Sequence, residues 1–238
     1  RQSGEGVGDR AMKYRICAVV PAKTAHDLTA MLEKAEKAEP DLIEIRIDYL
    51  AENFKSKNVR KLTDIPLIAT NRSKKEGGLF EGPESKRIDL LLRAAKDGFD
   101  FIDIELMPSR NMSLVEKINS MGVKTIVSFH NFTSTPSLSE MRRIFQKMLE
   151  TEADVCKIVT KARSVDDNLS ILRFVREASK ESKVVSFCMG KLGISSRILS
   201  PIFGAFFTYA SLERGRESAE GQLTIDEIRA VHSFLGVK

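Results

Sequence analysis

The chain has 238 residues, of which 42% are hydrophobic and 30% charged, so it is long enough for one large globular core or for two small domains. The formal net charge of +5 suits an anionic ligand, although interspersed lysine and glutamate on solvated helices give the same balance. The basic residues are dispersed and tryptophan is absent, which argues against nucleic acid as a partner. The longest apolar run, residues 198–210, is broken by proline and glycine and is too short to cross a membrane.

Residues 1–11 are polar and glycine-rich and contain no apolar segment of the kind found in signal peptides. They are expected to form a disordered N-terminal extension or to be a remnant of cloning. The folded domain is expected to occupy residues 12–238.

Short apolar runs alternate with amphipathic helical stretches from Tyr14 to the end of the chain. Eight of these runs are predicted strands, at residues 14–20, 41–47, 67–71, 101–105, 123–129, 154–159, 183–188 and 205–210. Helical periodicity predicts helices at residues 25–38, 84–97, 137–150, 165–180 and 225–235, whereas residues 51–62 show the least helical pattern. Thr24, Ser164 with Asp167, and Thr224 with Glu227 are expected to cap three of these helices.

Eight strand and helix units in this length predict an α/β protein with a single (β/α)8 TIM barrel. A doubly wound open sheet is the alternative. That fold normally has a glycine-rich turn after its first strand, and residues 20–23, Val-Pro-Ala-Lys, contain no glycine.

Charged and polar side chains gather at the C-terminal ends of five successive predicted strands. In a barrel the chemistry lies at this end, because the βα loops meet there. The second strand reads Glu44-Ile-Arg46-Ile-Asp48, so its three charges share one face, which must point into the barrel because the helix layer is apolar. The other members of the set are Arg72, Asp103, Glu105, His130 and Lys157. Each could singly be a structural ion pair, but five strands ending in this way favour an active site.

Lys157 lies in the middle of the apolar segment 154–160, which predicts a strand packed between two layers. A buried ammonium is costly, and desolvation favours the neutral amine, which can condense with a ketone or aldehyde to form an imine. The structural alternative is a lysine that extends to water from the end of its strand. The neighbouring charged strand ends favour the imine-forming interpretation.

His130 follows the apolar run of the preceding strand and is expected to lie beside Lys157 at the mouth of the barrel. An imidazole there can move the protons that carbinolamine dehydration, α-proton removal and leaving-group departure require. Glu76 could orient that imidazole, and the two glycines after it indicate a loop that approaches a ligand or bends sharply. The structural alternatives are a hydrogen-bonded core histidine and a solvated loop carboxylate.

Two late loops are candidate ligand-binding segments. Residues 189–197 follow the seventh predicted strand and open a helix, so backbone donors and Arg197 could hold an anion. Residues 208–211 close the eighth strand, and Ser218 and Gln222 lie in the last βα loop, which could fold over the mouth as a lid. An ordinary helix cap and turn is the structural alternative for both loops.

Cys17, Cys156 and Cys188 fall in predicted strands without paired spacing, so they are expected to be buried, reduced thiols of a cytoplasmic protein. With three histidines and no CxxC or HExxH motif, the sequence gives no support for a metal site built by the protein.

Several of these segments together resemble type I 3-dehydroquinate dehydratases. The matching residues are Glu44-Ile-Arg46-Ile-Asp48, Thr70-Asn-Arg72 with Glu76-Gly-Gly, Ser128-Phe-His130, Lys157 in its apolar strand, Met189-Gly with Ser196-Arg197, and the loop from Ser218 to Gln222. The resemblance runs from about Ile16 to the C-terminus, and the order and spacing of the motifs make it more specific than any one of them. It implies a cytoplasmic, commonly homodimeric hydro-lyase of the shikimate pathway, with a (β/α)8 catalytic domain and no cofactor, that converts 3-dehydroquinate to 3-dehydroshikimate with loss of water.

The resemblance also implies a role for each residue of the site. Lys157 would form the imine, His130 would be the general acid and base, and Glu76 would stand beside His130. Glu44, Arg46 and Arg72 would line the hydroxyl side of the substrate. Arg197 would bind its carboxylate, and Ser218 and Gln222 would close over it.

Three positions depart from the family pattern: Phe187-Cys188 in place of a Ser/Met-rich segment, Asn131 in place of the usual Asp after His130, and Glu220 in place of an expected Pro in the lid. Two other functions remain open. A class I aldolase would also use a lysine on the sixth strand, but it would usually need a phosphate site after strands seven and eight. A barrel that binds a metabolite without catalysis has no need of both Lys157 and His130.

Overall fold

The computed structural model describes residues 14–50, 55–106 and 111–237, in which strands and helices alternate along the chain. The strands are β1 Ile16–Val20, β2 Leu42–Arg46, β3 Leu67–Thr70, β4 Phe101–Glu105, β5 Lys124–Asn131, β6 Val155–Lys161, β7 Lys183–Met189 and β8 Thr208–Ser211. The helices are α1 Ala25–Ala38, α2 Ser56–Val59, α3 Glu84–Lys96, α4 Asn111–Asn119, α5 Leu138–Leu149, α6 Asp166–Ala178, α7 Ile194–Leu199 and α8 Ile225–Phe234. The prediction for residues 1–11 lies outside the described residues.

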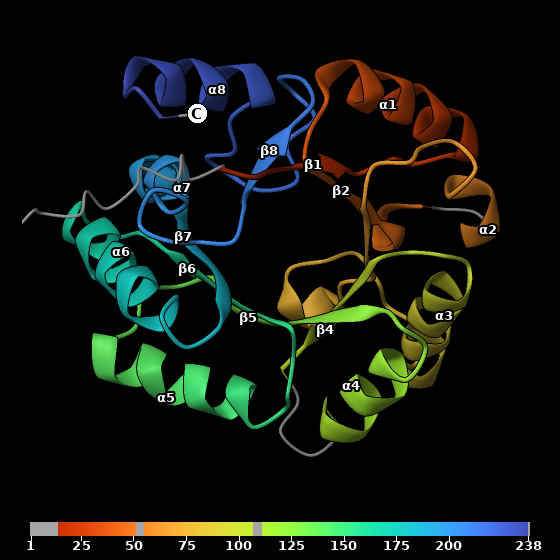
Figure 1. The fold of residues 1–238 in the computed structure, drawn as a ribbon, viewed down its shortest axis with the longest axis horizontal. Helices are drawn as coiled ribbons and strands as arrows, with labels where there is room; N and C mark the ends of the chain where they lie inside the picture. The colour runs from red at the N-terminus through yellow and green to blue at the C-terminus, as the bar shows by residue number, and fades with distance from the viewer. Residues whose placement is uncertain (1–13, 51–54, 107–110, 238) are drawn as a thin grey trace, which may run out of the picture.

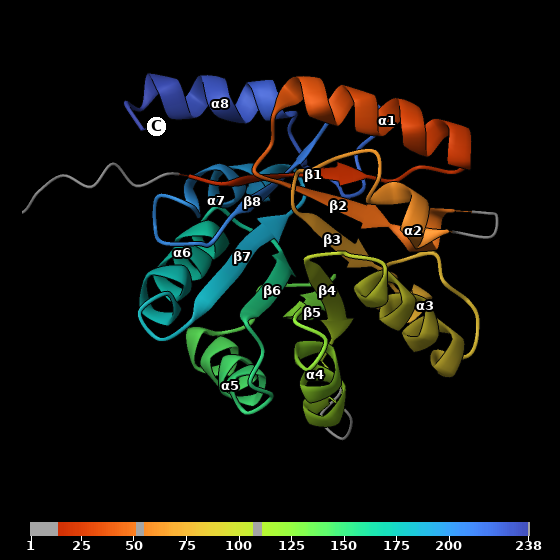
Figure 2. The same ribbon diagram turned by 45° about the vertical axis from the view of Figure 1, so that its right-hand side comes forward.

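The strands form one parallel sheet in the order β7-β6-β5-β4-β3-β2-β1-β8, and the helices surround it (Figure 1). The two end strands are brought together by a hydrogen bond from the N–H of Phe206, just before β8, to the carbonyl of Val184 in β7, at 2.8 Å. Turned by 45°, the ribbon shows the strands side by side with the helices outside them (Figure 2). The prediction of a single (β/α)8 barrel is confirmed.

Both faces of each strand are buried, because the crossover helices cover the outer face and the barrel encloses the inner one. The inward side chains change character along the barrel axis. Near the N-terminal end they are apolar, namely Leu42, Ile68, Phe101, Ile126 and Val155. Two residues further along the same five strands, the buried side chains are polar or charged, namely Glu44, Thr70, Asp103, Ser128 and Lys157. The polar layer therefore lies at the C-terminal end of a packed apolar floor.

Predicted boundaries differ from the structure where pairing outlasts the apolar pattern. β5, β6 and β7 extend to Asn131, Lys161 and Met189, because the ladders continue to the pairs Asn131 with Thr160 and Lys161 with Met189. The eighth strand begins at Thr208 rather than at residue 205, because β1 begins at Ile16 and offers no earlier partner.

Two of the three predicted helix caps are confirmed. The Thr24 hydroxyl accepts a hydrogen bond from the N–H of Asp27, and Thr224 and Glu227 form a reciprocal capping box. The Ser164 prediction is wrong, since α6 has Val165 at its N-cap position. The Asp167 carboxylate instead accepts the N–H groups of Arg163 and Ser164.

The three cysteines are buried and unpaired, as expected. Across the described ranges, no helix combines the length and apolar character needed to span a bilayer.

Candidate active site

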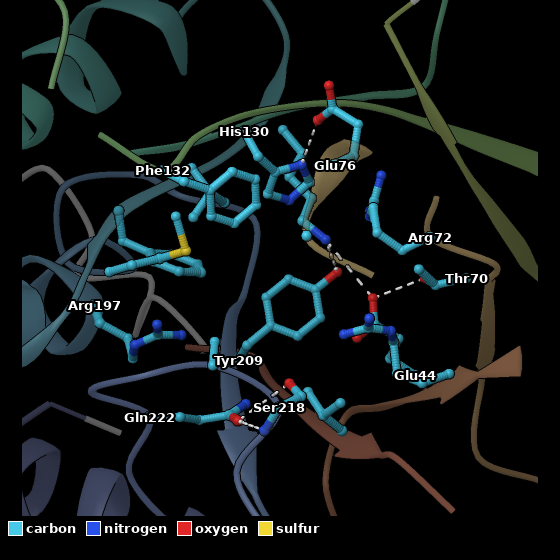
Figure 3. Close-up of a pocket in the computed structure, with 18 residues that line it drawn as sticks. Glu44, Thr70, Arg72, Glu76, His130, Phe132, Arg197, Tyr209, Ser218 and Gln222 are labelled. Atoms are coloured by element: carbon cyan, nitrogen blue, oxygen red, sulfur yellow. Dashed lines mark hydrogen bonds and ion pairs between the residues drawn. The ribbon is translucent and has the colours of Figure 1, made fainter. Parts of the chain in front are cut away.

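A cavity of about 540 Å³, including the part open to solvent, lies at the C-terminal end of the barrel and is within the range of small-molecule sites. The nine residues singled out from the sequence all line it: Glu44, Arg46, Arg72, Glu76, His130, Lys157, Arg197, Ser218 and Gln222 (Figure 3). They come from strands β2, β5 and β6, from helix α7 and from the loops after β3 and β8, so only the folded barrel brings them together.

Lys157 is 5% exposed and extends into the cavity from β6. Its Nζ donates a hydrogen bond to Oδ2 of Asp103 at 2.9 Å and one to Oη of Tyr209 at 3.0 Å, and it lies 3.7 Å from Oε1 of Glu44. The sequence predicted the burial of the amine, whereas only the structure shows that two carboxylates and a phenol compensate for it. The nitrogen is thereby held in one position at the cavity wall.

Asp103 joins Lys157 to Arg72. Its Oδ1 accepts hydrogen bonds from Nη2 of Arg72 at 2.8 Å and from the Ser128 hydroxyl at 2.6 Å. Burial would raise the pKa of this carboxyl, but the positive charges of Arg72 and Lys157 and these hydrogen bonds hold the pKa well below its ordinary 3.8. Asp103 is therefore a permanent carboxylate that positions two cations.

Glu44 and Arg46 face the cavity from β2, as the period of two predicted. Glu44 accepts a hydrogen bond from the Thr70 hydroxyl at 2.8 Å. Arg46 donates two hydrogen bonds to Asp48, from Nε at 2.9 Å and from Nη2 at 2.7 Å. Asp48 itself lies in a short 3-10 turn, Ile47–Tyr49, and also accepts the N–H of Leu79, so it is a structural residue that fixes Arg46 and the loop after β3.

His130 lies on β5, the strand next to β6, which carries Lys157. Ser128 is the residue in register with Lys157, so His130 lies two positions nearer the mouth of the barrel than Lys157 does. Burial and the nearby charges of Arg72 and Lys157 hold the pKa of its imidazole well below 6.5. The ring is therefore neutral at physiological pH. A neutral imidazole at a cavity wall can accept a proton from a ligand.

Glu76 reaches the same imidazole, with Oε2 3.4 Å from Nδ1 of His130, although neither atom has a hydrogen-bond partner within the described residues. Burial, followed by the nearby Glu105 carboxylate, raises the pKa of Glu76 above 4.5. The pair can thus tighten into a hydrogen bond when a ligand fills the cavity, as catalytic contacts often do.

The two glycines after Glu76 lie in a sharp bend, which is one of the two alternatives expected from the sequence, and close approaches within the protein also require them. Gly77 has a φ of +73°, and a Cβ there would lie 2.3 Å from Cζ of Phe132. The Phe132 ring in turn stacks on His130, with centroids 5.8 Å apart. A Cβ on Gly78 would lie 2.1 Å from the carbonyl oxygen of Arg72. The loop therefore closes the side of the cavity on which the imidazole stands.

Arg197 is 1% exposed and lies on α7 with its guanidinium 4.2 Å from the centre of the Phe187 ring. Its Nε and Nη2 have no hydrogen-bond partner in the described part of the chain. Burial lowers the pKa of Arg197 to about 10, so the group remains charged at neutral pH. A buried cation without a partner that lines a cavity indicates an anion-binding position.

Two backbone donors near the start of α7 are used within the protein. The N–H of Gly193 donates to the carbonyl of Gly190, and the N–H of Ser196 donates to the Asn168 side chain. These two groups are therefore not available to an anion. The side chain of Arg197 is the part of the predicted anion site that faces the cavity.

The loop after β8 covers the cavity from the side of β7. Oε1 of Gln222 accepts hydrogen bonds from the N–H and the hydroxyl of Ser218, at 2.9 and 3.3 Å. The carbonyl of Glu220 accepts the N–H of Gly190, and its carboxylate pairs with Lys161 at the end of β6. Glu220, which departs from the family pattern, therefore attaches the loop to the barrel.

Sequence reasoning did not assign a role to two other residues of this site, Asp103 and Tyr209. Asp103 was recognised only as one of several inward charges, and Tyr209 only as part of the last strand. Their inward-facing strand positions were the available signal. Among the described residues, no group of three histidine, cysteine, aspartate or glutamate side chains is arranged to hold a metal ion.

Comparison with known proteins gives one consistent result. The type I 3-dehydroquinase family matches residues 16–238. A 3-dehydroquinate dehydratase of Dehalococcoides mccartyi is 37% identical over 217 residues, which are 91% of this chain and 94% of the relative. The solved 3-dehydroquinate dehydratase of Geobacillus kaustophilus superposes with a TM-score of 0.89 at 27% identity, covering 94% of this chain and 91% of that one. The type I enzyme of Clostridium difficile, solved with covalent modified comenic acid, has a TM-score of 0.85 at 27% identity and covers 94% of each chain.

Proposed function

Because this chain belongs to the type I 3-dehydroquinase family of hydro-lyases, we propose that it removes water from 3-dehydroquinate to give 3-dehydroshikimate through an imine on Lys157. The observation that carries the proposal is the placement, around one cavity, of a buried amine, a neutral imidazole and an unpartnered guanidinium. Two other functions were open from the sequence, a class I aldolase and a barrel that binds a metabolite without catalysis. Neither is the activity of the family to which this chain belongs.

The imine makes the neighbouring C–H bond of the substrate acidic. The Lys157 ammonium releases a proton to solvent and the neutral amine adds to the ketone; the carbinolamine then takes up one proton and loses the ketone oxygen as water, which leaves a protonated imine that withdraws electrons. His130 then removes the α-proton, and the electron pair of that C–H bond moves to the nitrogen to form an enamine. The enamine expels the β-hydroxyl, to which His130 returns the proton, and water finally hydrolyses the imine of the product.

Arg197 is proposed to bind the substrate carboxylate, since Nε and Nη2 of its buried guanidinium have no hydrogen-bond partner among the described residues. Glu44, Arg46 and Arg72 would contact the ring hydroxyls, and Ser218 and Gln222 would close over the ring. The Clostridium difficile relative with covalent modified comenic acid supports covalent ligand chemistry in this family. No step of the proposed reaction calls for a cofactor.

The imine is tested by trapping. The protein is incubated with 3-dehydroquinate, reduced with borohydride, and mapped by mass spectrometry, and we expect a dehydrated substrate adduct on Lys157. Lys183→Met is the matched control, because Lys183 lies at the exposed N-terminal end of the neighbouring strand β7 and should leave trapping unchanged. Unmodified Lys157 together with full turnover would rule out the imine.

Replacement of Arg197 gives a second prediction: substrate binding should weaken, whereas the substrate-free protein should become more stable. Arg197→Met should raise KM for 3-dehydroquinate about 10²-fold, because a charged pair with the substrate is lost. It should also raise the free energy of unfolding of the substrate-free protein, because a buried charge without a partner is removed.

Arg87→Met is the matched control for that prediction. Arg87 is also 1% exposed, but it is paired with Glu84 and donates to the carbonyl of Asn71. Its replacement should lower the free energy of unfolding by about 3 to 5 kcal/mol. Chemical denaturation measures both variants, and an Arg197→Met effect confined to kcat would contradict the carboxylate assignment.

We also propose a cytoplasmic homodimer with its catalytic domain in residues 12–238. Support for the cytoplasm comes from the three free, buried cysteines, since an oxidising compartment favours disulfides. Light scattering on the purified protein tests the dimer through its molar mass.

A further inference from the structure

Tyr209 is fixed beside the nitrogen of Lys157. It is 4% exposed and faces inward from β8. Its ring packs edge-on against Phe187 and Phe207, with centroids 6.2 and 5.2 Å away, so the plane of the ring is set by its neighbours. Its Oη lies 3.0 Å from Nζ of Lys157, and Nζ lies 4.4 Å from the centre of the ring.

The hydroxyl of Tyr209 has a hydrogen to give. A phenol has one O–H donor besides its lone pairs, and here a lone pair accepts the hydrogen bond from Lys157. The hydrogen bonds of the described residues include none in which this O–H is the donor. Burial, followed by the nearby Glu44 carboxylate, raises the pKa of Tyr209 well above 10, so the group stays protonated.

The hydroxyl also stands where the reacting oxygen of a ketone must pass. In Figure 3 the Tyr209 ring lies between Arg197 and Glu44, and its hydroxyl points away from Ser218 and Gln222. A substrate with its carboxylate on Arg197 and its ketone at Lys157 therefore extends along this ring. The nitrogen and oxygen of a carbinolamine share one carbon, so a hydroxyl within hydrogen-bond distance of the nitrogen can also reach the oxygen when that oxygen faces the ring of Tyr209.

We propose that the Tyr209 hydroxyl carries a proton from Nζ of Lys157 to the ketone oxygen as the carbinolamine forms. This inference rests on the proposed imine function. The amine lone pair forms the C–N bond, and the carbonyl π pair moves to the oxygen, which leaves a positive nitrogen and an alkoxide. Oη takes a proton from the nitrogen while its own proton passes to the alkoxide. The products are a neutral carbinolamine and an unchanged phenol, and the reverse transfer serves product release.

The other groups that contact Nζ do not fit this transfer. Asp103 is held as a carboxylate and has no proton to give the alkoxide. Glu44 is further away, at 3.7 Å, and its Oε1 already accepts the Thr70 hydroxyl. A phenol that is protonated before and after the step suits a concerted relay, in which no tyrosinate accumulates. His130 then remains available for the α-carbon and for the leaving hydroxyl.

Tyr209→Phe tests the relay, because it removes one oxygen and keeps the ring. The variant and its parent are mixed with excess 3-dehydroquinate, quenched with borohydride at successive times, and weighed by intact mass spectrometry. The rate constant for adduct formation should fall about 10²-fold in the variant. Equilibrium binding of 3-dehydroshikimate and the thermal unfolding midpoint should stay close to those of the parent. Tyr14→Phe, ahead of β1 at the opposite end of the barrel, is the matched control and should behave like the parent.

The outcomes separate this inference from the proposed function. A parent that forms no adduct overturns the imine itself. A parent that forms the adduct, with a Tyr209→Phe variant that forms it at the same rate, overturns the relay alone. The parent also gives a test that needs no variant: adduct formation should be slower in D2O, because two protons move in the step, and equal rates in the two solvents would refute the relay.

Discussion

Lys157→Ala is expected to lower kcat by at least about 10⁴-fold, because it removes the nucleophile and with it the covalent intermediate. Binding should survive, since Arg197 and the loop carrying Ser218 and Gln222 are untouched. The measurement is the appearance of the conjugated product by ultraviolet absorbance, with binding of 3-dehydroshikimate measured separately by calorimetry.

The same change should also destabilise the protein. Nζ of Lys157 contacts Asp103 at 2.9 Å and Glu44 at 3.7 Å, and all three residues are buried. Removal of the cation leaves these carboxylates undercompensated, and we expect a loss of about 3 kcal/mol in the free energy of unfolding. Lys183→Met should keep both kcat and stability. Residual turnover near the parental level in Lys157→Ala would exclude the covalent route.

His130→Ala should separate formation of the adduct from its processing. We expect kcat to fall about 10² to 10⁴-fold, which is the usual contribution of a positioned acid or base. The borohydride-trapped adduct on Lys157 should still appear at the parental rate, in contrast to the slow trapping expected of Tyr209→Phe. His26→Gln, at an exposed position near the start of α1, is the control and should leave both quantities unchanged. Parental activity in His130→Ala would refute the acid and base role.

The pH dependence of turnover in the unsubstituted protein follows from His130. His130 must be neutral to accept the α-proton, and its pKa lies well below 6.5 because of burial and the charges of Arg72 and Lys157. Turnover should therefore persist as the pH falls through 6.5 and decline only below it. The profile of log(kcat/KM) against pH measures this, because it reports the groups of the substrate-free protein, and a decline centred at or above 6.5 would show that the imidazole is not held neutral.

The free energy of unfolding should also fall at low pH. The unfolded chain binds a proton at His130 below about pH 6.5, whereas the folded protein resists it, so the free energy of unfolding should fall as the pH falls below that value. His130→Ala should reduce this dependence, as chemical denaturation at several pH values would show.

Much of the site was predictable because strand periodicity is a local property. Alternation in the segment Glu44-Ile-Arg46 assigns the inward face of the strand without knowledge of any partner strand. The side chains of a barrel interior form layers, and the five polar positions at 44, 70, 103, 128 and 157 occupy one such layer. Helix capping was predictable where the cap is local, as at Thr24 and Thr224. It failed at Ser164, where the Asp167 carboxylate accepts the backbone N–H groups instead.

The sequence by itself therefore predicted the barrel, the end at which the cavity lies, and nine of the eighteen residues that line this cavity. The tertiary structure alone decided which of those charges are paired and which are free. Asp48 and Glu105 are occupied in holding loops, whereas Nε and Nη2 of Arg197 have no hydrogen-bond partner in the described ranges. Tyr209 meets Lys157 from 52 positions further along the chain. The physical reason is that burial and spacing are encoded strand by strand, but hydrogen bonds across the barrel depend on side chains that only closure of the sheet brings within 3 Å of one another.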